Sequence, residues 1–261
     1  MQGSIHCERK GRVGSITIDR PPLNILNIEA FDSLHDALSE LTSGGSAVDV
    51  IVIRSAGEKA FCAGADIGDH TPEAAPRMLE SFHRVARRLR TIDAVTVAAA
   101  RGVALGGGFE LLQCCDIVVA AEDIQLGQPE ILVGSFPPIA AVVLPAAAGG
   151  PIASDLVLTG RRVTGQEALA RGLVSRLVPA SELDAEVGRV VESLERNSGA
   201  VMRLAVKALR GSRGGEFVAA LARTERIYID ELLKLEDARE GVKAFMEKRP
   251  PKWSRGGGSA R

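Results

Sequence analysis

The sequence predicts an α/β protein with a helical C-terminal region. Upstream of about residue 125, short runs rich in Val, Ile and Ala alternate with segments whose apolar residues recur every three to four positions. Repeated alternation of strand and helix patterns is typical of layered α/β folds rather than of β-sandwiches. Downstream of about residue 150, helical patterns dominate. We therefore expect a core of sheets and helices, followed by a helical region.

The expected strands are short and mostly buried. Residues 13–19 alternate, with Ile16 and Ile18 on one face, as a half-buried strand does. Continuous apolar runs predict buried strands at 48–53, 94–99 and 116–121. Between them, apolar side chains at helical spacing predict two amphipathic helices. One stripe contains Phe31, Leu34, Leu38 and Leu41, and the other runs from Met78 to Leu89.

The C-terminal helices are predicted from their end signals. Thr164 and Glu167 have the spacing of a capping box, and Gly172 stands where that helix is expected to stop. Ser181 is expected to cap a second helix that runs to about Asn197. Three further helices are expected over residues 201–209, 217–235 and 237–248, before a pair of prolines.

Composition limits the classes of partner. Of 261 residues, 32 are basic and 33 acidic, so the net charge is -1. This balance argues against nucleic acid and acidic membranes as partners, and an aromatic content of 3% argues against base-stacking surfaces. The stretch 131–154 carries no charge, but its prolines and glycines would break a membrane-spanning helix, so we expect a buried or interface segment without membrane contact.

The cysteines and histidines give no sign of a metal site. No secretory signal is visible at the N-terminus, so we expect reduced thiols and a cytoplasmic location. None of the cysteines forms a C-x-x-C pair or has a histidine at zinc-ligand spacing, and the four histidines are scattered. We therefore expect no metal. The cysteines are Cys7, Cys62, Cys114 and Cys115.

Two glycine-containing turns are the main candidates for chemistry. They span residues 61–67 and 102–111, and each lies between an expected strand and an expected helix. Free N–H groups at a helix start can face a negative oxygen, and consecutive glycines let a ligand approach the backbone closely. The alternative is that both are tight turns packed against neighbouring helices. A dinucleotide-binding fingerprint fails because Leu111 stands where a third small residue is needed.

Six segments along the chain share a recognisable order and spacing. They are Arg20-Pro21-Pro22-Leu23-Asn24-Ile25-Leu26-Asn27, Phe61-Cys62-Ala63-Gly64-Ala65-Asp66-Ile67, Gly102-x-Ala104-x-Gly106-Gly107-Gly108-x-Glu110-Leu111, Cys115-Asp116, Leu126-Gly127-Gln128-Pro129-Glu130 and Leu158-Thr159-Gly160-Arg161 through Gly172-Leu173-Val174. Over residues 5–250, this order and spacing resemble the enoyl-CoA hydratase/isomerase (crotonase) superfamily.

This resemblance implies a fold and an assembly. The expected fold is an α/β crotonase-like spiral of ββα units with two packed sheets, followed by C-terminal helices that build trimers or dimers of trimers. Residues 1–197 would form the spiral core with the CoA and active sites. Residues 198–261 would form the helical region, with a disordered Gly-rich tail from about 254.

The resemblance also implies an acyl-CoA substrate, no separate cofactor and a set of site residues. The backbone N–H groups of Ala65 and Gly107 would form an oxyanion hole for the thioester carbonyl. Glu110 as base and Glu130 as acid would add water across a double bond. The alternative for each glutamate is a surface or helix-capping role. Substrate contacts are expected at Leu23, Ile25, Ala63, Asp66, Ile67, Gly106, Phe136, Phe245 and Lys248.

The chain departs from many straight-chain hydratases after Glu130. The segment Gly134-Ser135-Phe136-Pro137-Pro138 is similar to that of the cyclohexa-1,5-diene-1-carbonyl-CoA hydratases. Phe136 would then shape the acyl pocket for a flat ring. The equally plain alternative is that Phe136 fills the core where a helix begins. Pro138 is expected to begin that helix. An open-chain enoyl-CoA remains the alternative substrate.

Two alternative functions stay open. The enzymatic alternative is a double-bond isomerase or another crotonase-type lyase or hydrolase, and the non-enzymatic alternative is an RNA-binding member of the superfamily.

Overall fold

The computed structural model describes residues 4–43 and 48–254, apart from the side chains of 211–215. Two sheets form its centre. The first contains, in order, β1 (Ser4–Lys10), β2 (Val13–Asp19), β3 (Val50–Ser55), β5 (Val95–Ala100), β7 (Ile117–Ala121) and β10 (Arg176–Val178). The second contains, in order, β4 (Ala60–Cys62), β6 (Val103–Leu105), β8 (Gln125–Gly127) and β9 (Arg162–Thr164).

The chain alternates between the two sheets. Each of β3, β5 and β7 in the larger sheet is followed by β4, β6 or β8 in the smaller one, and then by a helical segment. Strands β2, β3, β5, β7 and β10 pair in parallel, as do β4, β6 and β8, whereas β1 and β9 are antiparallel to their neighbours. This repetition is the expected spiral of ββα units with two packed sheets.

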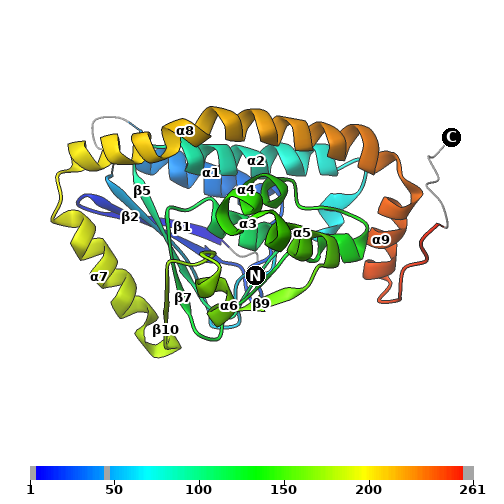
Figure 1. Ribbon diagram of the computed structural model, residues 1–261, viewed down its shortest axis with the longest axis horizontal. Helices are drawn as coiled ribbons and strands as arrows, with labels where there is room; N and C mark the ends of the chain where they lie inside the picture. The colour runs from blue at the N-terminus through cyan, green and yellow to red at the C-terminus, as the bar shows by residue number, and fades with distance from the viewer. Residues whose placement is uncertain (1–3, 44–47, 255–261) are drawn as a thin grey trace.

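The helices cover the sheets and extend beyond them. α8 runs along one side of the molecule above α1 and α2, with α7 near one of its ends and α9 near the other (Figure 1). The α-helices are α1 (Ile28–Thr42), α2 (Ala75–Thr91), α3 (Gly107–Gln113), α4 (Pro138–Ala148), α5 (Gly150–Thr159), α6 (Gly165–Ala170), α7 (Leu183–Glu195), α8 (Gly199–Arg226) and α9 (Glu236–Met246). Shorter 3-10 and π segments are η2 (Ile67–His70), η3 (Pro129–Val133), η4 (Ala180–Glu182), η5 (Ile227–Glu231) and η6 (Leu232–Lys234).

The central strands β3 and β5 of the larger sheet are buried on both faces. Ile51 and Ile53 of β3 join the main core with α1 and α2, whereas Val50 and Val52 join a second core. The second core is completed by residues of α7 and of the first turns of α8. Parallel strands covered on both faces are expected to be nearly continuously apolar, which is the pattern of Val50–Ile53 in β3 and, apart from Thr96, of β5. Each large buried side chain contributes roughly 1.5–3 kcal/mol.

The structure corrects the expected helix ends in the C-terminal part. Residues 201–209 and 217–235 do not form two separate helices, because α8 is continuous from Gly199 to Arg226 and passes into the π segment η5. Ion pairs fix its first half to the core: Arg203 pairs with Asp49, and Arg210 with Asp116. We infer that this packing outweighs the low helix propensity of the glycines within α8.

Two capping expectations are also corrected. Ser181 lies within η4 and does not cap α7, which begins at Leu183. The Thr164 hydroxyl accepts from the Glu167 N–H at 3.3 Å, as expected, but the Glu167 carboxylate pairs with Arg161 rather than returning to the cap. Of the tail expected to be disordered from about residue 254, residues 255–261 lie outside the described residues.

The uncharged stretch 131–154 contributes to η3, α4 and α5. Within the described residues, no helix is long and apolar enough to cross a membrane. The same residues contain no group of three or more His, Cys, Asp or Glu side chains placed to hold a metal ion.

Candidate active site

The first glycine turn follows β4 and presents the amide of Ala65. Residue Gly64 has φ +111°, a conformation that favours glycine. Its carbonyl accepts from the Leu26 N–H at 3.0 Å, and the Asp66 N–H donates to the Leu26 carbonyl at 2.9 Å. These bonds form a parallel bridge between Leu26 and Ala65. The amide of Ala65 therefore faces away from the Leu26 segment.

The second turn follows β6 and starts α3. Gly106 has φ +51°, and Gly107 is the first residue of the helix. Gly108 packs so closely on the Cys62 carbonyl that a Cβ atom there would collide with it. This close approach sets the start of α3 directly against β4 and the first turn.

The two turns bring the amides of Ala65 and Gly107 together. A Cβ atom built on Gly107 would lie 3.5 Å from the Ala65 nitrogen. Among the described residues, no carbonyl or side chain accepts a hydrogen bond from either amide. For Gly107 the reason is general, because the first amides of a helix have no intrahelical acceptor. Two adjacent unpaired N–H groups are suited to hold one negative oxygen.

Glu130 reaches the second turn from η3. A Cβ atom on Gly106 would lie 2.5 Å from Glu130 Oε1, so only glycine leaves space for this carboxyl group. The buried Gln128 amide, oriented with its nitrogen toward Glu130, donates to both carboxyl oxygens at 3.2 Å. Gln128 was quoted in the sequence motif but was not predicted as a site residue.

Glu110 lies in α3 and is buried. Its Oε1 accepts from the Ala140 N–H at 2.8 Å, at the start of α4. Burial raises the pKa of Glu110 to about 7, partly offset by hydrogen bonds from Ala140 and Ile139. Pro138 begins α4, as expected, and thereby places these amides at a helix N-terminus.

The two glutamates influence each other. Burial raises the pKa of Glu130 well above its usual value, and the charge of Glu110 raises it further. Two buried carboxyl groups that repel in this way cannot both ionise without a large cost. The site therefore favours a state in which one carboxyl group is protonated and the other is ionised.

The expected CoA contacts of the first half lie around the first turn. Ala63 donates to the Leu23 carbonyl at 2.9 Å, which places the exposed side chains of Leu23 and Ile25 beside this turn. Asp66 caps η2 through the Gly68 N–H at 2.9 Å, and Ile67 is the first residue of that segment. The carboxylate of Asp66 therefore has a structural role, and its expected contact with the substrate stays a prediction.

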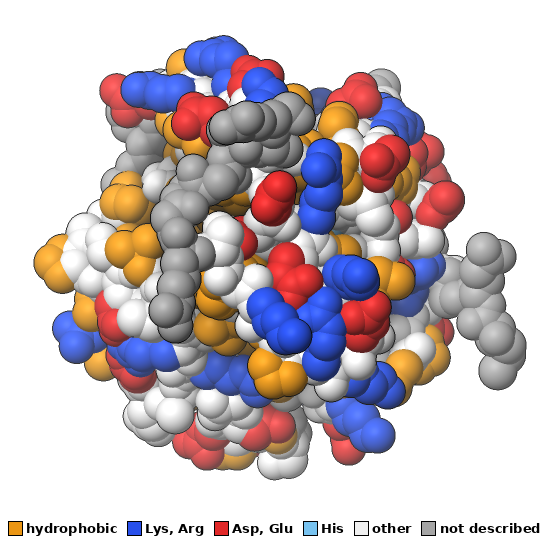
Figure 2. All heavy atoms as spheres, turned by 90° about the vertical axis from the view of Figure 1, so that its right-hand side faces the viewer, with side chains coloured by type: hydrophobic (Ala, Val, Ile, Leu, Met, Phe, Trp, Pro, Cys, Tyr) orange, Lys and Arg blue, Asp and Glu red, His pale blue; other side chains and the backbone are white. Residues whose placement is uncertain are grey.

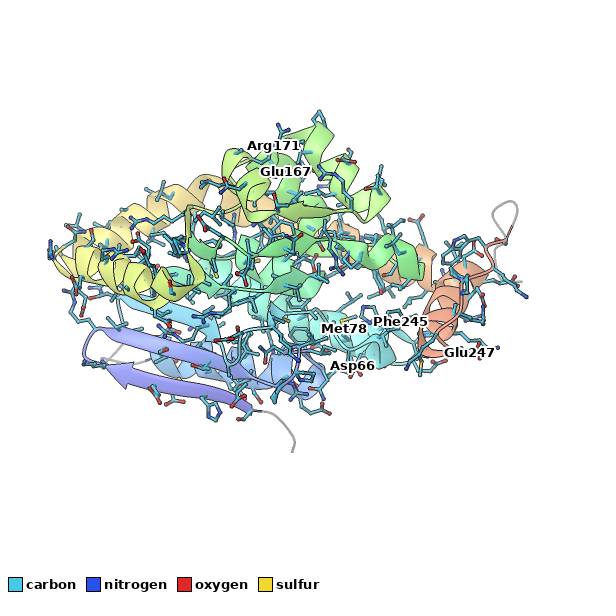
Figure 3. The ribbon with its side chains drawn as sticks, turned by 90° about the horizontal axis from the view of Figure 1, so that it is seen from below. Asp66, Met78, Glu167, Arg171, Phe245 and Glu247 are labelled. Atoms are coloured by element: carbon cyan, nitrogen blue, oxygen red, sulfur yellow. The ribbon has the colours of Figure 1, made fainter. Side chains whose placement is uncertain are left out.

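The expected contacts in the last helix lie at the same end of the molecule. Phe245 in α9 is 57% exposed and is seen near Asp66, far from Glu167 and Arg171 (Figure 3). A cavity of about 480 Å³ separates α9 from the segment that follows η2 and is lined on the α9 side by Val242 and Met246. Lys248 is exposed beyond the end of α9 and does not line this cavity.

Phe136 occupies the connection between η3 and α4. It is half-buried against the main core, and its ring centroid lies 5.4 Å from that of Tyr228. The Ser135 hydroxyl donates to the Tyr228 oxygen at 3.0 Å. Sequence reasoning missed this pair, because residues 93 positions apart gave no local signal of contact.

Solved structures of known proteins share the overall fold of this chain. A carnitinyl-CoA hydratase from Mycobacterium avium has a TM-score of 0.86 and 33% identity, with 97% of this chain and 99% of that chain covered. An enoyl-CoA hydratase from Mycobacterium avium subsp. paratuberculosis also has a TM-score of 0.86, with 28% identity and coverage of 97% and 100%. The architecture is therefore the α/β crotonase fold.

The sequence comparisons place the chain in a family. The model of the enoyl-CoA hydratase/isomerase family matches residues 8–256. A probable enoyl-CoA hydratase of Mycobacterium bovis is 36% identical, with 96% of this chain and 98% of the relative covered. The cyclohexa-1,5-dienecarbonyl-CoA hydratase of Thauera aromatica is 33% identical, with 94% of each covered. The chain belongs to the enoyl-CoA hydratase/isomerase family. It is an enzyme, and its homologues include enoyl-CoA hydratases, which have lyase activity.

Proposed function

We propose that this chain adds water to an α,β-unsaturated acyl-CoA thioester. The observation that carries the proposal is the convergence of two unpaired amides, Ala65 and Gly107, with two buried carboxyl groups, Glu110 and Glu130. Adding a nucleophile to such a thioester moves charge onto the carbonyl oxygen. Two fixed N–H donors in a site shielded from water stabilise that charge, and each is worth about 2.7–4 kcal/mol of barrier lowering.

The carboxyl groups have the properties that the two proton transfers require. With its pKa near 7, Glu110 is available as the base that takes a proton from water as oxygen bonds to the β-carbon. With a pKa raised further by Glu110, Glu130 is available in its protonated form to protonate the α-carbon. The presence of both groups supports hydration over isomerisation, which moves one proton within the substrate and needs no water.

The acyl group is proposed from the η3–α4 connection. Phe136 and Tyr228 present a pair of aromatic rings close to the glutamates, and the Thauera aromatica relative is named for a cyclic diene substrate. A cyclic dienoyl-CoA is therefore one proposed substrate, and an open-chain enoyl-CoA is the other, since other relatives are named as enoyl-CoA hydratases. CoA itself would be held near Leu23 and Ile25, with Phe245 and Lys248 at the same end of the molecule.

Self-association as a trimer or a dimer of trimers is also proposed. Its support is the set of large apolar side chains that α8 leaves exposed: Val201, Leu204 and Leu209 are each more than 60% exposed. RNA binding is less well supported. Acidic and basic side chains are interspersed on the end of the molecule that carries α9 (Figure 2), whereas binding a phosphate backbone needs a basic surface.

The test is hydration of crotonyl-CoA and cyclohexa-1,5-diene-1-carbonyl-CoA, followed by mass spectrometry for the gain of one water. Glu110→Gln and Glu130→Gln keep the side-chain shape but remove the titratable group. We expect each to lower turnover by at least about a hundredfold, the lower end of the contribution of general acid–base catalysis, with CoA-ester binding retained. A variant with parental turnover on every accepted substrate would exclude that glutamate from the chemistry.

A further inference from the structure

The connection between η3 and α4 lies between Glu130 and the backbone amide that holds Glu110. Glu130 lies in η3 before this connection, and Ala140, whose N–H holds Glu110 at 2.8 Å, lies in the first turn of α4 after it. Ser135 lies between them, and its own N–H donates to the Glu130 carbonyl at 2.9 Å. A displacement of this connection would therefore change the distance between the two carboxyl groups.

The C-terminal region contacts this connection at two points. The buried Tyr228 oxygen accepts from the Ser135 hydroxyl at 3.0 Å, and the Thr224 hydroxyl donates to the Pro138 carbonyl at 3.2 Å. Thr224 and Tyr228 are one helical turn apart, so both contacts come from the same face. Tyr228 lies in the π segment η5, and π turns inside helices frequently occur at functional sites.

Tyr228 retains a hydrogen-bond donor. Its oxygen accepts from Ser135, so the phenolic O–H remains available, and no described residue accepts it. Tyr228 is 2% exposed. This burial is the main reason that the pKa of Tyr228 is raised to about 12, and the charges of Glu130 and Glu110 also raise it. The phenol therefore stays protonated near both carboxyl groups.

We propose that Tyr228 is a positioning residue for the hydration reaction. Through Ser135 it holds the connection between η3 and α4, and it thereby fixes the relative placement of Glu110 and Glu130. The proposal rests on the proposed function of these glutamates. It assigns to the C-terminal region a direct part in the geometry of the active site. A packing role alone would need the Tyr228 ring but not its hydroxyl group.

The test compares Tyr228→Phe with Ser135→Ala and with the double variant in the hydration assay. Tyr228→Phe keeps the ring and its contact with Phe136, and removes only the hydroxyl. We expect kcat to fall about 10- to 100-fold, the range for a small misplacement of catalytic groups, with KM within about twofold of the parent. The double variant should lose no more than the more affected single variant, because both remove the same contact.

A pH profile separates positioning from stability. If Tyr228 fixes the placement of the two glutamates, Tyr228→Phe changes their separation and therefore their mutual repulsion, so the pH at which kcat titrates should shift from its parental value. Ser81→Ala is the matched control, because this buried hydroxyl has no partner among the described residues. It should leave both kcat and the pH profile unchanged.

The outcomes distinguish the two proposals. If Glu110→Gln and Glu130→Gln abolish hydration but Tyr228→Phe keeps parental kcat and pH profile, the positioning role is wrong and the proposed function stands. A fall in melting temperature without a change in kcat would equally contradict positioning. If the glutamate variants keep parental turnover, the proposed function itself fails.

Discussion

The buried carboxyl group of Glu110 makes the stability of the folded chain depend on pH. Burial raises its pKa from 4.5 to about 7. A carboxyl group whose pKa is raised in the folded state stabilises folding below its unfolded pKa, and this contribution is lost as pH rises through the folded value. The relevant window therefore runs from about pH 4.5 to about pH 7.

Glu110→Gln should remove this dependence. Since Gln does not ionise, the variant should gain stability relative to the parent as pH rises from 5 to 8, by roughly 2–3 kcal/mol, which is most of the free energy of the pKa shift. Denaturant unfolding at both pH values measures this difference. Glu58→Gln, at an exposed site, controls for the loss of one charge. An equal difference between Glu110→Gln and the parent at pH 5 and pH 8 would refute the assignment of the raised pKa.

At the scale of elements, the contact between α3 and β4 determines whether the two amides converge. Gly108 is the residue that permits it, because a Cβ atom there would overlap the Cys62 carbonyl. A backbone carbonyl within a strand cannot rotate away as a flexible side chain can. Any larger residue at position 108 must therefore push the start of α3 away from the first turn.

Gly108→Ala should lower both stability and turnover. We expect a loss of about 1–3 kcal/mol, the usual cost of overpacking, together with a fall in hydration rate as Gly107 moves relative to Ala65. The matched control is Gly188→Ala in α7, where a Cβ atom would meet nothing within 4 Å. That change should stabilise by about 0.5–1 kcal/mol. Similar melting temperatures for the two variants would contradict this account.

At the scale of the whole molecule, ion pairs that each contain a buried side chain attach α8 to the rest of the chain. Arg210 is 8% exposed and pairs with Asp116, and it also donates to the carbonyls of Ile92 and Ala94. Near the start of α8, Arg203 pairs with the buried Asp49, which also pairs with Arg12 from the turn between β1 and β2. These contacts hold the C-terminal region on the domain that carries the glycine turns.

Arg210→Met should destabilise the whole chain. The change removes the charged partner of Asp116, which keeps only its hydrogen bonds from Thr96, and takes one donor from the carbonyls of Ile92 and Ala94. Breaking a buried ion pair in this way typically costs about 3–5 kcal/mol. Urea unfolding monitored by circular dichroism measures this loss. Arg196→Met is the control, because its pair with Glu192 at 3.8 Å is exposed and should contribute nothing measurable. Equal unfolding midpoints for the two variants would show that α8 is not held by this ion pair.

The predictable part of the molecule was its local structure. The strand at 13–19, the two amphipathic helices and the start of α4 at Pro138 follow from apolar periodicity and end signals. The same local signals misjudged α8, which they divided into two helices, and α7, where Ser181 indicated a cap. In α8 the neighbouring layers supply contacts that propensity does not include.

The sequence by itself determined the element pattern, the glycine turns and, through resemblance, the residues that form the candidate site. Only the tertiary structure decided that Ala65 and Gly107 lie side by side, that the amide of Ala140 holds Glu110, and that Tyr228 reaches Ser135. Periodicity and capping depend on neighbours a few positions apart. Contacts between distant residues depend instead on how the sheets pair and how the layers pack, which no local pattern specifies.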